Sequence, residues 1–207
     1  MLHFDTISPE MRGIASVIHR ELDAGYYLAG GTALALLIGH RESVDLDYFL
    51  AQSINTEKLK AKLLGLFPGV TFTYEDVDTL WCQIDGVKVS FITRLAALAE
   101  PLRDKDEFRI ASVSDLVVMK LNAVCGRDEY KDYYDLAQLS VITDVRTWPT
   151  LWAQVYPESD PIAWMVALAH VSETVEVPLQ GKKLQTRQEI EMRLDMIVKE
   201  LSPFVGK

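Results

Sequence analysis

The chain has 207 residues and a formal net charge of −9, with a pI near 4.9. This length suits one ordinary domain, or a compact domain with a helical extension. The acidity argues against broad nucleic-acid binding through counterion release, but a local basic patch is compatible with it. No apolar run reaches the ~18 residues of a membrane span, and the amino terminus lacks a signal-peptide pattern, so we expect a soluble, cytoplasmic protein. Cys82 and Cys125 follow no metal spacing and are expected to be small core residues of a reduced protein.

The first predicted element is a helix that begins after Ser8. Ser8 supplies a capping hydroxyl, and Pro9 occupies the first helical position. Apolar residues then recur at helical spacing up to Leu22, so the helix should pack an apolar stripe on a sheet and end before Gly25. Residues 26–50 are predicted to form a strand, a Gly-Gly turn, an apolar helix, a polar loop and a second strand.

This strand-helix-strand stretch combines features of a phosphate site and a metal site. Gly30 and Gly31 let the backbone approach a ligand closely, because glycine has no Cβ. Thr32 lies at the mouth of the helix, where its hydroxyl and the free backbone N–H groups can hold a phosphate. Asp45 and Asp47 are two apart in a strand and should point to the same side.

Two neighbouring carboxylates repel each other unless a cation lies between them or one of them binds a proton. A hard divalent cation such as Mg²⁺, bound also by substrate phosphates, resolves this repulsion and predicts phosphoryl-type transfer. A structural alternative stays open on spacing alone. In it, Asp45 begins the strand, Asp47 lies on a solvated edge, and Gly-Gly-Thr is an ordinary turn.

The same residues carry a family resemblance. Gly-Gly-Thr followed by Asp-Leu-Asp resembles the signature of the DNA polymerase beta superfamily of nucleotidyltransferases, and GGTALALLIGHRESVDLDYFL resembles the AbiEii/AbiGii toxin family. The Gly-His-Arg part of this segment adds Arg41 to the nucleotide-binding candidates. The resemblance implies an α/β (α+β) nucleotidyltransferase fold with a small mixed sheet. It also implies Mg²⁺ on Asp45 and Asp47, and transfer of a nucleotidyl group from an NTP to an acceptor hydroxyl.

A helix and three strands are predicted next, over residues 55–67, 70–74, 79–84 and 87–93. Asp85-Gly86 joins the last two strands and is a strong hairpin signal. In many polymerase-beta-type nucleotidyltransferases a third carboxylate comes from the last strand, and the place expected for it holds Ser90. Asp85 is a poor substitute because the turn uses it. In this departure the strand resembles other AbiEii-like chains, and it leaves open whether the full three-carboxylate, two-metal site forms.

Helical patterns dominate beyond Ala97. The charged residues 100–109 are expected to form a solvated loop, and Ser112 or Ser114 is expected to cap a helix that runs to about Cys125. Three further helices are predicted over residues 148–156, 162–171 and 184–201. The tryptophans of these segments should be core residues, and His170 should pack or lie at a helix end rather than bind a metal.

A second group of charged residues lies in this helical half. Lys120 and Arg127 are seven apart and share a helix face, and Lys131 opens another helix together with Asp132 and Asp135. Taken alone, this KDYYD segment is most often an exposed, salt-bridged turn. The wider segment resembles the second conserved region of the AbiEii family. That resemblance implies that Lys120 faces the triphosphate, that Asp132 and Asp135 supply an acid or base and support the site, and that Lys131 belongs to the nucleotide-binding motif.

We therefore predict a nucleotidyltransferase core over residues 1–97 and a helical region over residues 98–207 that closes the cleft. The family resemblance implies the toxin of a toxin-antitoxin pair, with NTP as substrate, a cognate antitoxin as partner, and tRNA as a possible acceptor. Two alternatives stay open. One is transfer to a small molecule, as antibiotic-modifying members of the superfamily perform, and the other is a degenerate, non-catalytic binding protein, which Ser90 motivates.

Overall fold

The computed structural model describes residues 1–106, 108–171, 174, 178–181 and 184–204. The chain divides into two compact units, which are described separately below. The first contains Met1–Ala97 and Pro101–Ala111, and the second contains Leu98–Glu100 and Ser112–Lys207. Within the described residues, no helix is long and apolar enough to cross a membrane.

The described part of the first unit is built on a seven-stranded mixed sheet in the order β3-β4-β5-β2-β1-β7-β6. Strands β2 and β5 run parallel, as do β1 and β7, and the other neighbouring pairs are antiparallel. The predicted mixed sheet and α/β fold class are confirmed. The strands are β1 (Tyr27–Ala29), β2 (Asp45–Leu50), β3 (Thr71–Asp76), β4 (Thr79–Ile84), β5 (Val87–Thr93), β6 (Arg103–Lys105) and β7 (Phe108–Ile110).

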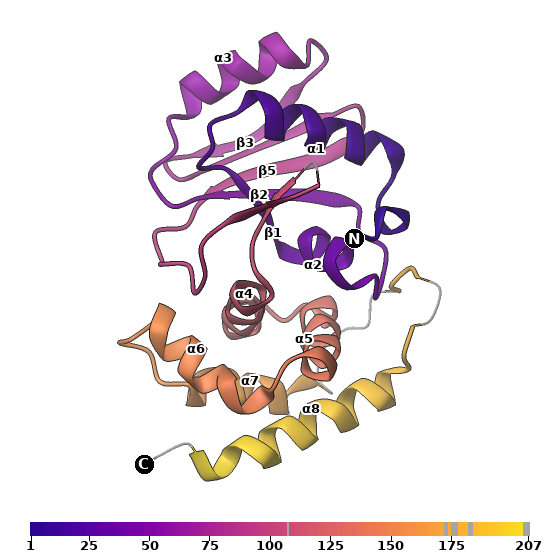
Figure 1. Cartoon of the computed structure of the whole chain (residues 1–207), viewed down its shortest axis with the longest axis vertical. Helices are drawn as coiled ribbons and strands as arrows, with labels where there is room; N and C mark the ends of the chain where they lie inside the picture. Colours follow the sequence, from indigo (N-terminus) through magenta and orange to yellow (C-terminus); the bar gives the residue numbers. More distant parts are fainter. Residues whose placement is uncertain (107, 172–173, 175–177, 182–183, 205–207) are drawn as a thin grey trace. The chain divides into compact units, whose positions relative to one another are not determined.

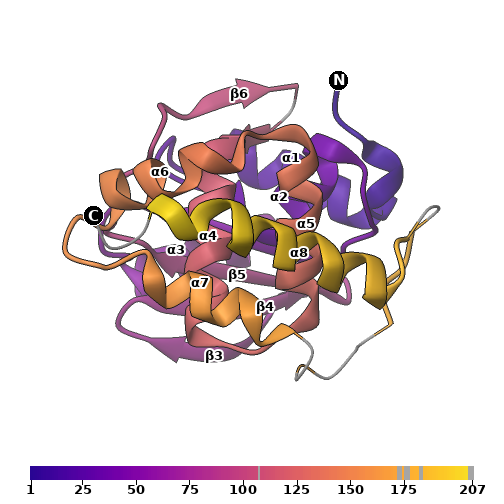
Figure 2. The same cartoon turned by 90° about the horizontal axis from the view of Figure 1, so that it is seen from below.

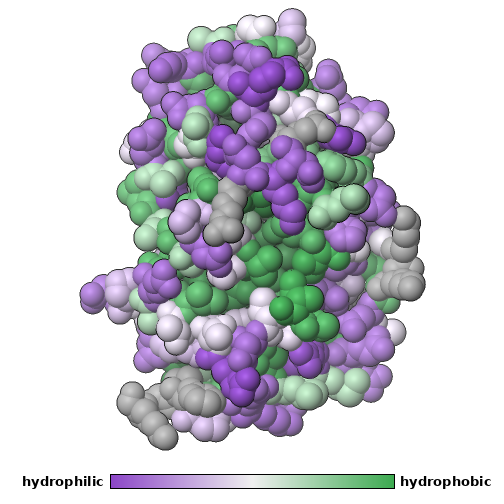
Figure 3. Space-filling model, viewed as in Figure 1, coloured by the Kyte–Doolittle hydropathy of each residue, from purple (hydrophilic) through white to green (hydrophobic). Residues whose placement is uncertain are grey.

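Helices α1 (Pro9–Glu21) and α3 (Thr56–Leu66) cover one face of this sheet (Figure 1). Ser8 caps α1 as predicted, because its hydroxyl accepts a hydrogen bond from the Met11 backbone N–H at 3.2 Å. The apolar side chains of α1 are buried, and the outer surface on this side is mainly hydrophilic (Figure 3). Helix α2 (Gly30–Ile38) links β1 to β2, so the predicted strand-helix-strand order of residues 26–50 is confirmed.

The predicted hairpin between β4 and β5 is also confirmed. Asp85 and Gly86 have φ angles of 49° and 82°, the left-handed pair that a two-residue type I′ turn requires. The strands pair from Ile84↔Val87 to Thr79↔Ile92. Asp85 is therefore a turn residue.

The expectation of a solvated loop over residues 100–109 is wrong. This segment contains β6 and β7, and β7 pairs in parallel with β1 through Leu28↔Ile110. Each strand has only three residues, with charged side chains among them, so local strand propensity is weak. β7 forms because it pairs with β1, a strand about eighty residues earlier in the chain, and a local sequence pattern cannot predict such long-range pairing.

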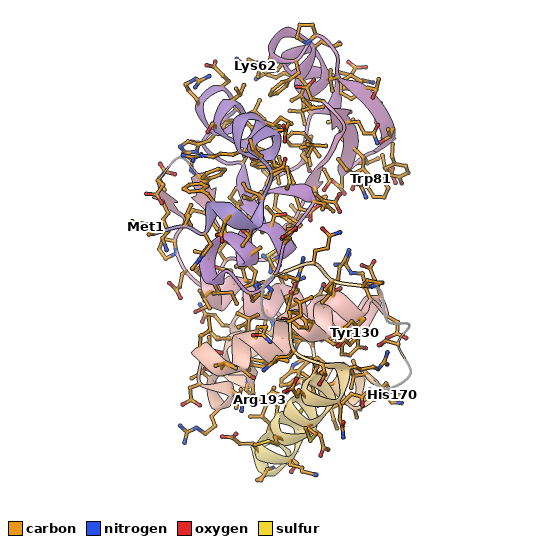
Figure 4. All side chains as sticks on the ribbon, turned by 90° about the vertical axis from the view of Figure 1, so that its right-hand side faces the viewer. Met1, Lys62, Trp81, Tyr130, His170 and Arg193 are labelled. Atoms are coloured by element: carbon orange, nitrogen blue, oxygen red, sulfur yellow. The ribbon has the colours of Figure 1, made fainter. Side chains whose placement is uncertain are left out.

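The second unit is helical, as predicted, and Figure 2 views its helices from below. Helix α4 packs against α5, α6 and α7, and α8 packs against α5 and α7. The Arg193 side chain, labelled in Figure 4, donates from Nε to Ser140 Oγ at 2.7 Å and from Nη2 to Ser140 O at 2.6 Å, which ties α8 to α5. The helices are α4 (Val113–Gly126), α5 (Tyr130–Ile142), α6 (Trp148–Val155), α7 (Ile162–Ala169) and α8 (Arg187–Leu201).

Predictions for single residues of this unit have mixed outcomes. Trp148, Trp152 and Trp164 are buried core residues, and His170 lies at the end of α7 with Nδ1 2.8 Å from Val166 O, both as predicted. Cys125 is exposed near the end of α4, so its assignment to the core is wrong. In the first unit Cys82 is buried, as predicted, and burial raises the pKa of its thiol to about 12.

The turn geometry predicts that Gly86→Ala lowers the free energy of unfolding by roughly 1–2 kcal/mol, the cost of a left-handed conformation for a residue with a Cβ. A Cβ at Gly86 would meet no atom within 4 Å, so the loss comes from the backbone alone. Gly69→Ala is the matched control, because that position is equally open and its φ is outside the left-handed region. Urea unfolding of both variants measures the difference, and equal midpoints would contradict the turn assignment.

Candidate functional site

The two carboxylates of β2 lie on one face of the sheet, as the spacing predicts. Burial alternates along the strand, so that Leu46, Tyr48 and Leu50 are buried in the core while Asp45 and Asp47 are half-buried on the other side. β2 is a central strand, paired with β1 on one side and with β5 on the other. The alternative in which Asp47 lies on a solvated edge is therefore wrong.

The start of α2 is next to Asp47, and its first residue requires glycine. Gly30 has a φ of +68°, and a Cβ there would lie 3.0 Å from Asp47 Oδ2. A Cβ at Gly31 would overlap the guanidinium of Arg41. The structure thus brings together Asp47, Arg41 and the two glycines, all of them predicted site residues. The first backbone N–H groups of a helix have no partner within the helix and favour an anion.

Thr32 holds the neighbouring loop in place. Its side chain is 1% exposed, and its hydroxyl donates to Asp45 O and lies 2.7 Å from Ser43 Oγ. Thr32 therefore fixes the backbone at Asp45, the first residue of β2. Sequence reasoning missed this role, because a contact across eleven residues is not visible in a helix-capping pattern. A contact of Thr32 with phosphate stays a prediction.

Ser90 lies beside Asp47, where the third carboxylate was expected. The parallel register pairs Asp47 with Ser90, and Ser90 Oγ donates a hydrogen bond to Asp47 Oδ1. Ser90 is 3% exposed, so this hydroxyl orients the carboxylate from within the sheet. In the described part of the chain, no group of three or more His, Cys, Asp or Glu side chains could hold a metal ion.

Arg41 places a positive charge at this site. Its side chain is 6% exposed, and Nη1 donates to Glu42 O at 2.9 Å. The same guanidinium lies against Gly31, at the start of α2. Its planar group suits carboxylate and phosphate oxygens, so the position fits the predicted nucleotide-binding role.

The second unit holds a separate buried ion cluster between α4 and α5. Lys120 Nζ lies 2.6 Å from Asp132 Oδ1 and 2.6 Å from Asp135 Oδ2. Arg127 Nε lies 2.8 Å from Asp132 Oδ2, and its side chain is half-exposed. Lys120 is 3% exposed, and both aspartates are fully buried. The cluster joins two helices through charge-assisted hydrogen bonds.

The alternative in which KDYYD is an exposed, salt-bridged turn is therefore wrong. Asp135 contacts Lys120 rather than standing as an exposed i,i+4 partner of Lys131, and Lys131 Nζ lies 2.7 Å from Glu129 Oε2. The structure thus gathers Lys120, Asp132 and Asp135 but directs Lys131 elsewhere. Arg127 is a partner to which sequence reasoning assigned no role, although its spacing of seven from Lys120 was the available signal.

Charges within the cluster move two pKa values. Burial alone would raise the pKa of Asp132, but the charges of Lys120 and Arg127 and the hydrogen bonds from them hold it below its usual value. Burial alone would lower the pKa of Lys120, but Asp135 and Asp132 hold it above its usual value. The charged forms of both groups are therefore the stable forms in the folded protein.

Lys120→Met is predicted to lower the free energy of unfolding by about 3–5 kcal/mol, because it leaves two carboxylates buried without their cation. Adding Asp132→Asn and Asp135→Asn to this variant should restore part of the loss. Lys131→Met, on the exposed surface, is the control and should change stability by less than about 0.5 kcal/mol. Urea unfolding tests this, and a Lys120→Met midpoint equal to the wild-type value would refute the structural role of the cluster.

The same cluster predicts a window of pH stability. The lowered pKa of Asp132 gives stability that is present above its unfolded-state pKa, about 4, and is lost as the pH falls below it. The raised pKa of Lys120 gives stability that is present below its unfolded-state pKa, about 10, and is lost as the pH rises through the folded value. The measurement is the free energy of unfolding against pH. The Lys120→Met/Asp132→Asn variant should lose less than wild type at both ends, and identical profiles would contradict the assignment.

Comparison with known proteins agrees with this architecture. Among solved structures, a candidate nucleotidyltransferase from H. pylori is 16% identical with a TM-score of 0.57 and 95% of each chain covered. MenT4, a nucleotidyltransferase toxin from Mycobacterium tuberculosis, is 14% identical with a TM-score of 0.57, covering 93% of this chain and 82% of that chain. At these identities the likeness concerns the fold, which is that of nucleotidyltransferases.

Sequence comparison identifies the family. An uncharacterized protein of Aquifex aeolicus (strain VF5) is 36% identical over 114 residues, which are 54% of this chain and 55% of that protein, so the match spans about half the length of this relative. The profile of a family described as the nucleotidyl transferase AbiEii toxin of a type IV toxin-antitoxin system matches residues 14–201. Because this match covers most of the chain and the fold agrees with it, the protein belongs to the AbiEii family of nucleotidyl transferase toxins.

Proposed function

We propose that the protein transfers a nucleotidyl group from an NTP to an acceptor hydroxyl at the site formed by β2 and the start of α2. One observation supports this most strongly. The carboxylates of Asp45 and Asp47 share a face of a central strand, and the neighbouring Gly30 has a left-handed φ, with Asp47 3.0 Å from where a Cβ would lie. A helix start held this close to an acid suits a phosphate that is bound together with a cation.

The donor set fits Mg²⁺. Hard cations take oxygen ligands, and Mg²⁺ is commonly held by one or two carboxylates together with substrate phosphates. Asp45 and Asp47 would be its protein ligands, and the remaining oxygens would come from the triphosphate and water. Bound there, the cation would neutralise phosphate charge and help to align the reacting oxygens.

The residues of the chain have distinct tasks in this proposal. The first N–H groups of α2 and the Arg41 guanidinium bind the phosphate oxygens, and Ser90 keeps Asp47 in one orientation. The acceptor oxygen forms a bond to the α-phosphorus while the bond to the leaving pyrophosphate breaks, with the two oxygens roughly in line. Positioning and charge stabilisation supply most of the catalysis in such reactions.

The ion cluster of the second unit has a supporting role in this proposal. Lys120 holds α4 to α5 through Asp132 and Asp135, which gives the helices a fixed arrangement. The direct contact between Lys120 and the triphosphate stays a prediction, as does acid-base work by the two aspartates. A catalytic role would appear as a loss of turnover in a Lys120 variant that still folds.

The family supports a toxin that acts on a cellular target and is countered by an antitoxin. We propose tRNA as the acceptor and the cytoplasm as the place of action. The net charge of −9 means that RNA must be held by local contacts rather than by the field of the whole surface. The same acidity keeps a small cationic acceptor as the second candidate, since such a molecule would be attracted to the protein.

Asp45→Asn and Asp47→Asn are each predicted to reduce transfer at least about 100-fold, the scale of losing one oriented electrostatic group, while melting temperature changes little. The assay combines labelled NTPs, total cellular RNA and Mg²⁺, and follows label in RNA and in small molecules. Asp85→Asn is the control, since it changes an acid that serves the β4–β5 turn. Unchanged turnover in either β2 variant would refute the site. Binding of NTP that does not depend on Mg²⁺, measured by calorimetry, would favour the non-catalytic alternative.

A further inference from the structure

A row of side chains crosses the sheet from Asp47, on the face opposite to α1 and α3. The strand register pairs Asp47 with Ser90 of β5 and Ser90 with Trp81 of β4. It then pairs Trp81 with Tyr74 of β3. Directly paired residues on neighbouring strands point to the same face. Trp81 and Tyr74 therefore share the face of the carboxylates, and Trp81 stands two strand spacings from Asp47, roughly 10 Å.

The two aromatic residues form a partly exposed platform, which we call the aromatic shelf. Their ring centroids are 4.7 Å apart, Tyr74 is 44% exposed, and Trp81 is half-buried. Trp81 is labelled in Figure 4. The exposed Lys88 lies on the same face, where it pairs with Asp45 of β2, and its Nζ is 4.6 Å from the centroid of the indole ring. Lys88 is thus the direct cross-strand neighbour of Asp45, and the aromatic pair begins two strands away from Asp47 on the same face.

The strand order indicates which substrate reaches the shelf. β1, which leads into Gly30, lies on one side of β2, while β5 and β4 lie on the other. The triphosphate belongs on the glycine side, because the free N–H groups of α2 are there. In-line transfer places the attacking oxygen opposite the leaving pyrophosphate. The acceptor therefore approaches from the side of Ser90 and Trp81.

We propose that Trp81 and Tyr74 stack an unpaired base at the end of an RNA acceptor, with Lys88 at the adjoining phosphate. This inference rests on the proposed nucleotidyl transfer and assigns the acceptor a chemical class. Successive bases of a nucleic acid stand about 3.4 Å apart, so a shelf roughly 10 Å from Asp47 serves the last few nucleotides. Stacking is sequence-tolerant, because every base presents an aromatic face.

Stacking also accounts for RNA binding by an acidic chain. Base stacking depends on ring contact rather than on net charge, so it does not require a broad basic surface, which a net charge of −9 disfavours. An incoming base can replace Lys88 over the indole, since an exposed cation–π contact is weaker than a base stack. The ammonium is then available to a phosphate.

An acidic neighbour limits how much RNA the shelf can bind. Asp76, two residues after Tyr74 on β3 and therefore on the same face, accepts a hydrogen bond from the Tyr74 hydroxyl at 3.2 Å. Further phosphates beyond the shelf would meet this carboxylate. The surface therefore suits a single-stranded end rather than a long duplex.

The test uses the full chain, a labelled NTP, and a short single-stranded oligoribonucleotide with a free 3′ hydroxyl. A second acceptor carries an abasic 3′-terminal nucleotide. Trp81→Ala should raise KM for the intact acceptor roughly 5- to 150-fold, the range for loss of one base stack, with KM for NTP unchanged. With the abasic acceptor, wild type and Trp81→Ala should have equal KM. Trp81→Phe keeps a stacking face and should stay within about threefold of wild type.

Gln83→Ala is the matched control, because Gln83 is an exposed neighbour on the same strand and face but lies outside the row. Circular dichroism checks folding, and Tyr74→Ala replaces Trp81→Ala if the latter does not fold. Equal acceptor KM in wild type and Trp81→Ala, or transfer only to a small molecule or a protein, would overturn the inference while transfer itself stands. If wild type transfers to no acceptor, the proposed function fails. Fluorescence anisotropy of the labelled oligoribonucleotide then tests whether the aromatic shelf binds RNA. Weaker binding by Trp81→Ala than by wild type would support the inference, and equal binding by the two would overturn it.

Discussion

The repulsion between Asp45 and Asp47 is the constraint on which the first unit depends. Two acids on one face of a central strand are costly unless their surroundings compensate for them. The structure fixes this strand from several directions. Thr32 holds the carbonyl of Asp45, Ser90 donates to Asp47, and the absence of a side chain at Gly30 lets Asp47 approach the start of α2. Each of these contacts uses a neutral group or a helix terminus.

The second unit treats its buried acids differently. Asp132 and Asp135 have Lys120 and Arg127 as cationic partners, so two negative charges face two positive ones within one cluster. Such a balanced cluster holds helices together but leaves little net charge for a ligand. Asp47 instead accepts a hydrogen bond from the neutral hydroxyl of Ser90, and the guanidinium of Arg41 lies against Gly31 at the start of α2. The two units thus surround their acids with different groups.

The sequence predicted features whose cause is local. The strand-helix-strand order of residues 26–50, the common face of Asp45 and Asp47, and the Asp85-Gly86 turn all follow from short-range spacing, and the structure contains them. What could not be predicted depends on distant partners. β7 is a strand because β1 is beside it, and Asp132 is buried because Lys120, twelve residues earlier, reaches it.

Burial at the end of a helix is a further limit. Val124 is buried and Cys125 is exposed, although both side chains are apolar and the two residues are adjacent in sequence. Each helical residue is rotated by about 100° from the one before it, so Val124 and Cys125 point in different directions. Near a helix end, the apolar pattern spans too few turns to predict which of the two directions faces the core. The function of Thr32 was missed for a related reason, since the hydroxyl turns toward the loop before β2 rather than toward the helix start.

Serine in place of a third carboxylate changes what the site requires. An acid at position 90 would put a third negative charge next to Asp47 and would demand more positive charge to bind there. Ser90 instead donates a hydrogen bond, which gives Asp47 a fixed orientation, and in the proposed reaction two carboxylates would be enough to hold one cation. The hydroxyl cannot serve as a strong base for the acceptor. Phosphoryl-type transfer tolerates this, because its loose transition state depends on alignment and charge stabilisation more than on early removal of a proton. In the proposed reaction, the face beyond Ser90 would therefore serve mainly to align the acceptor.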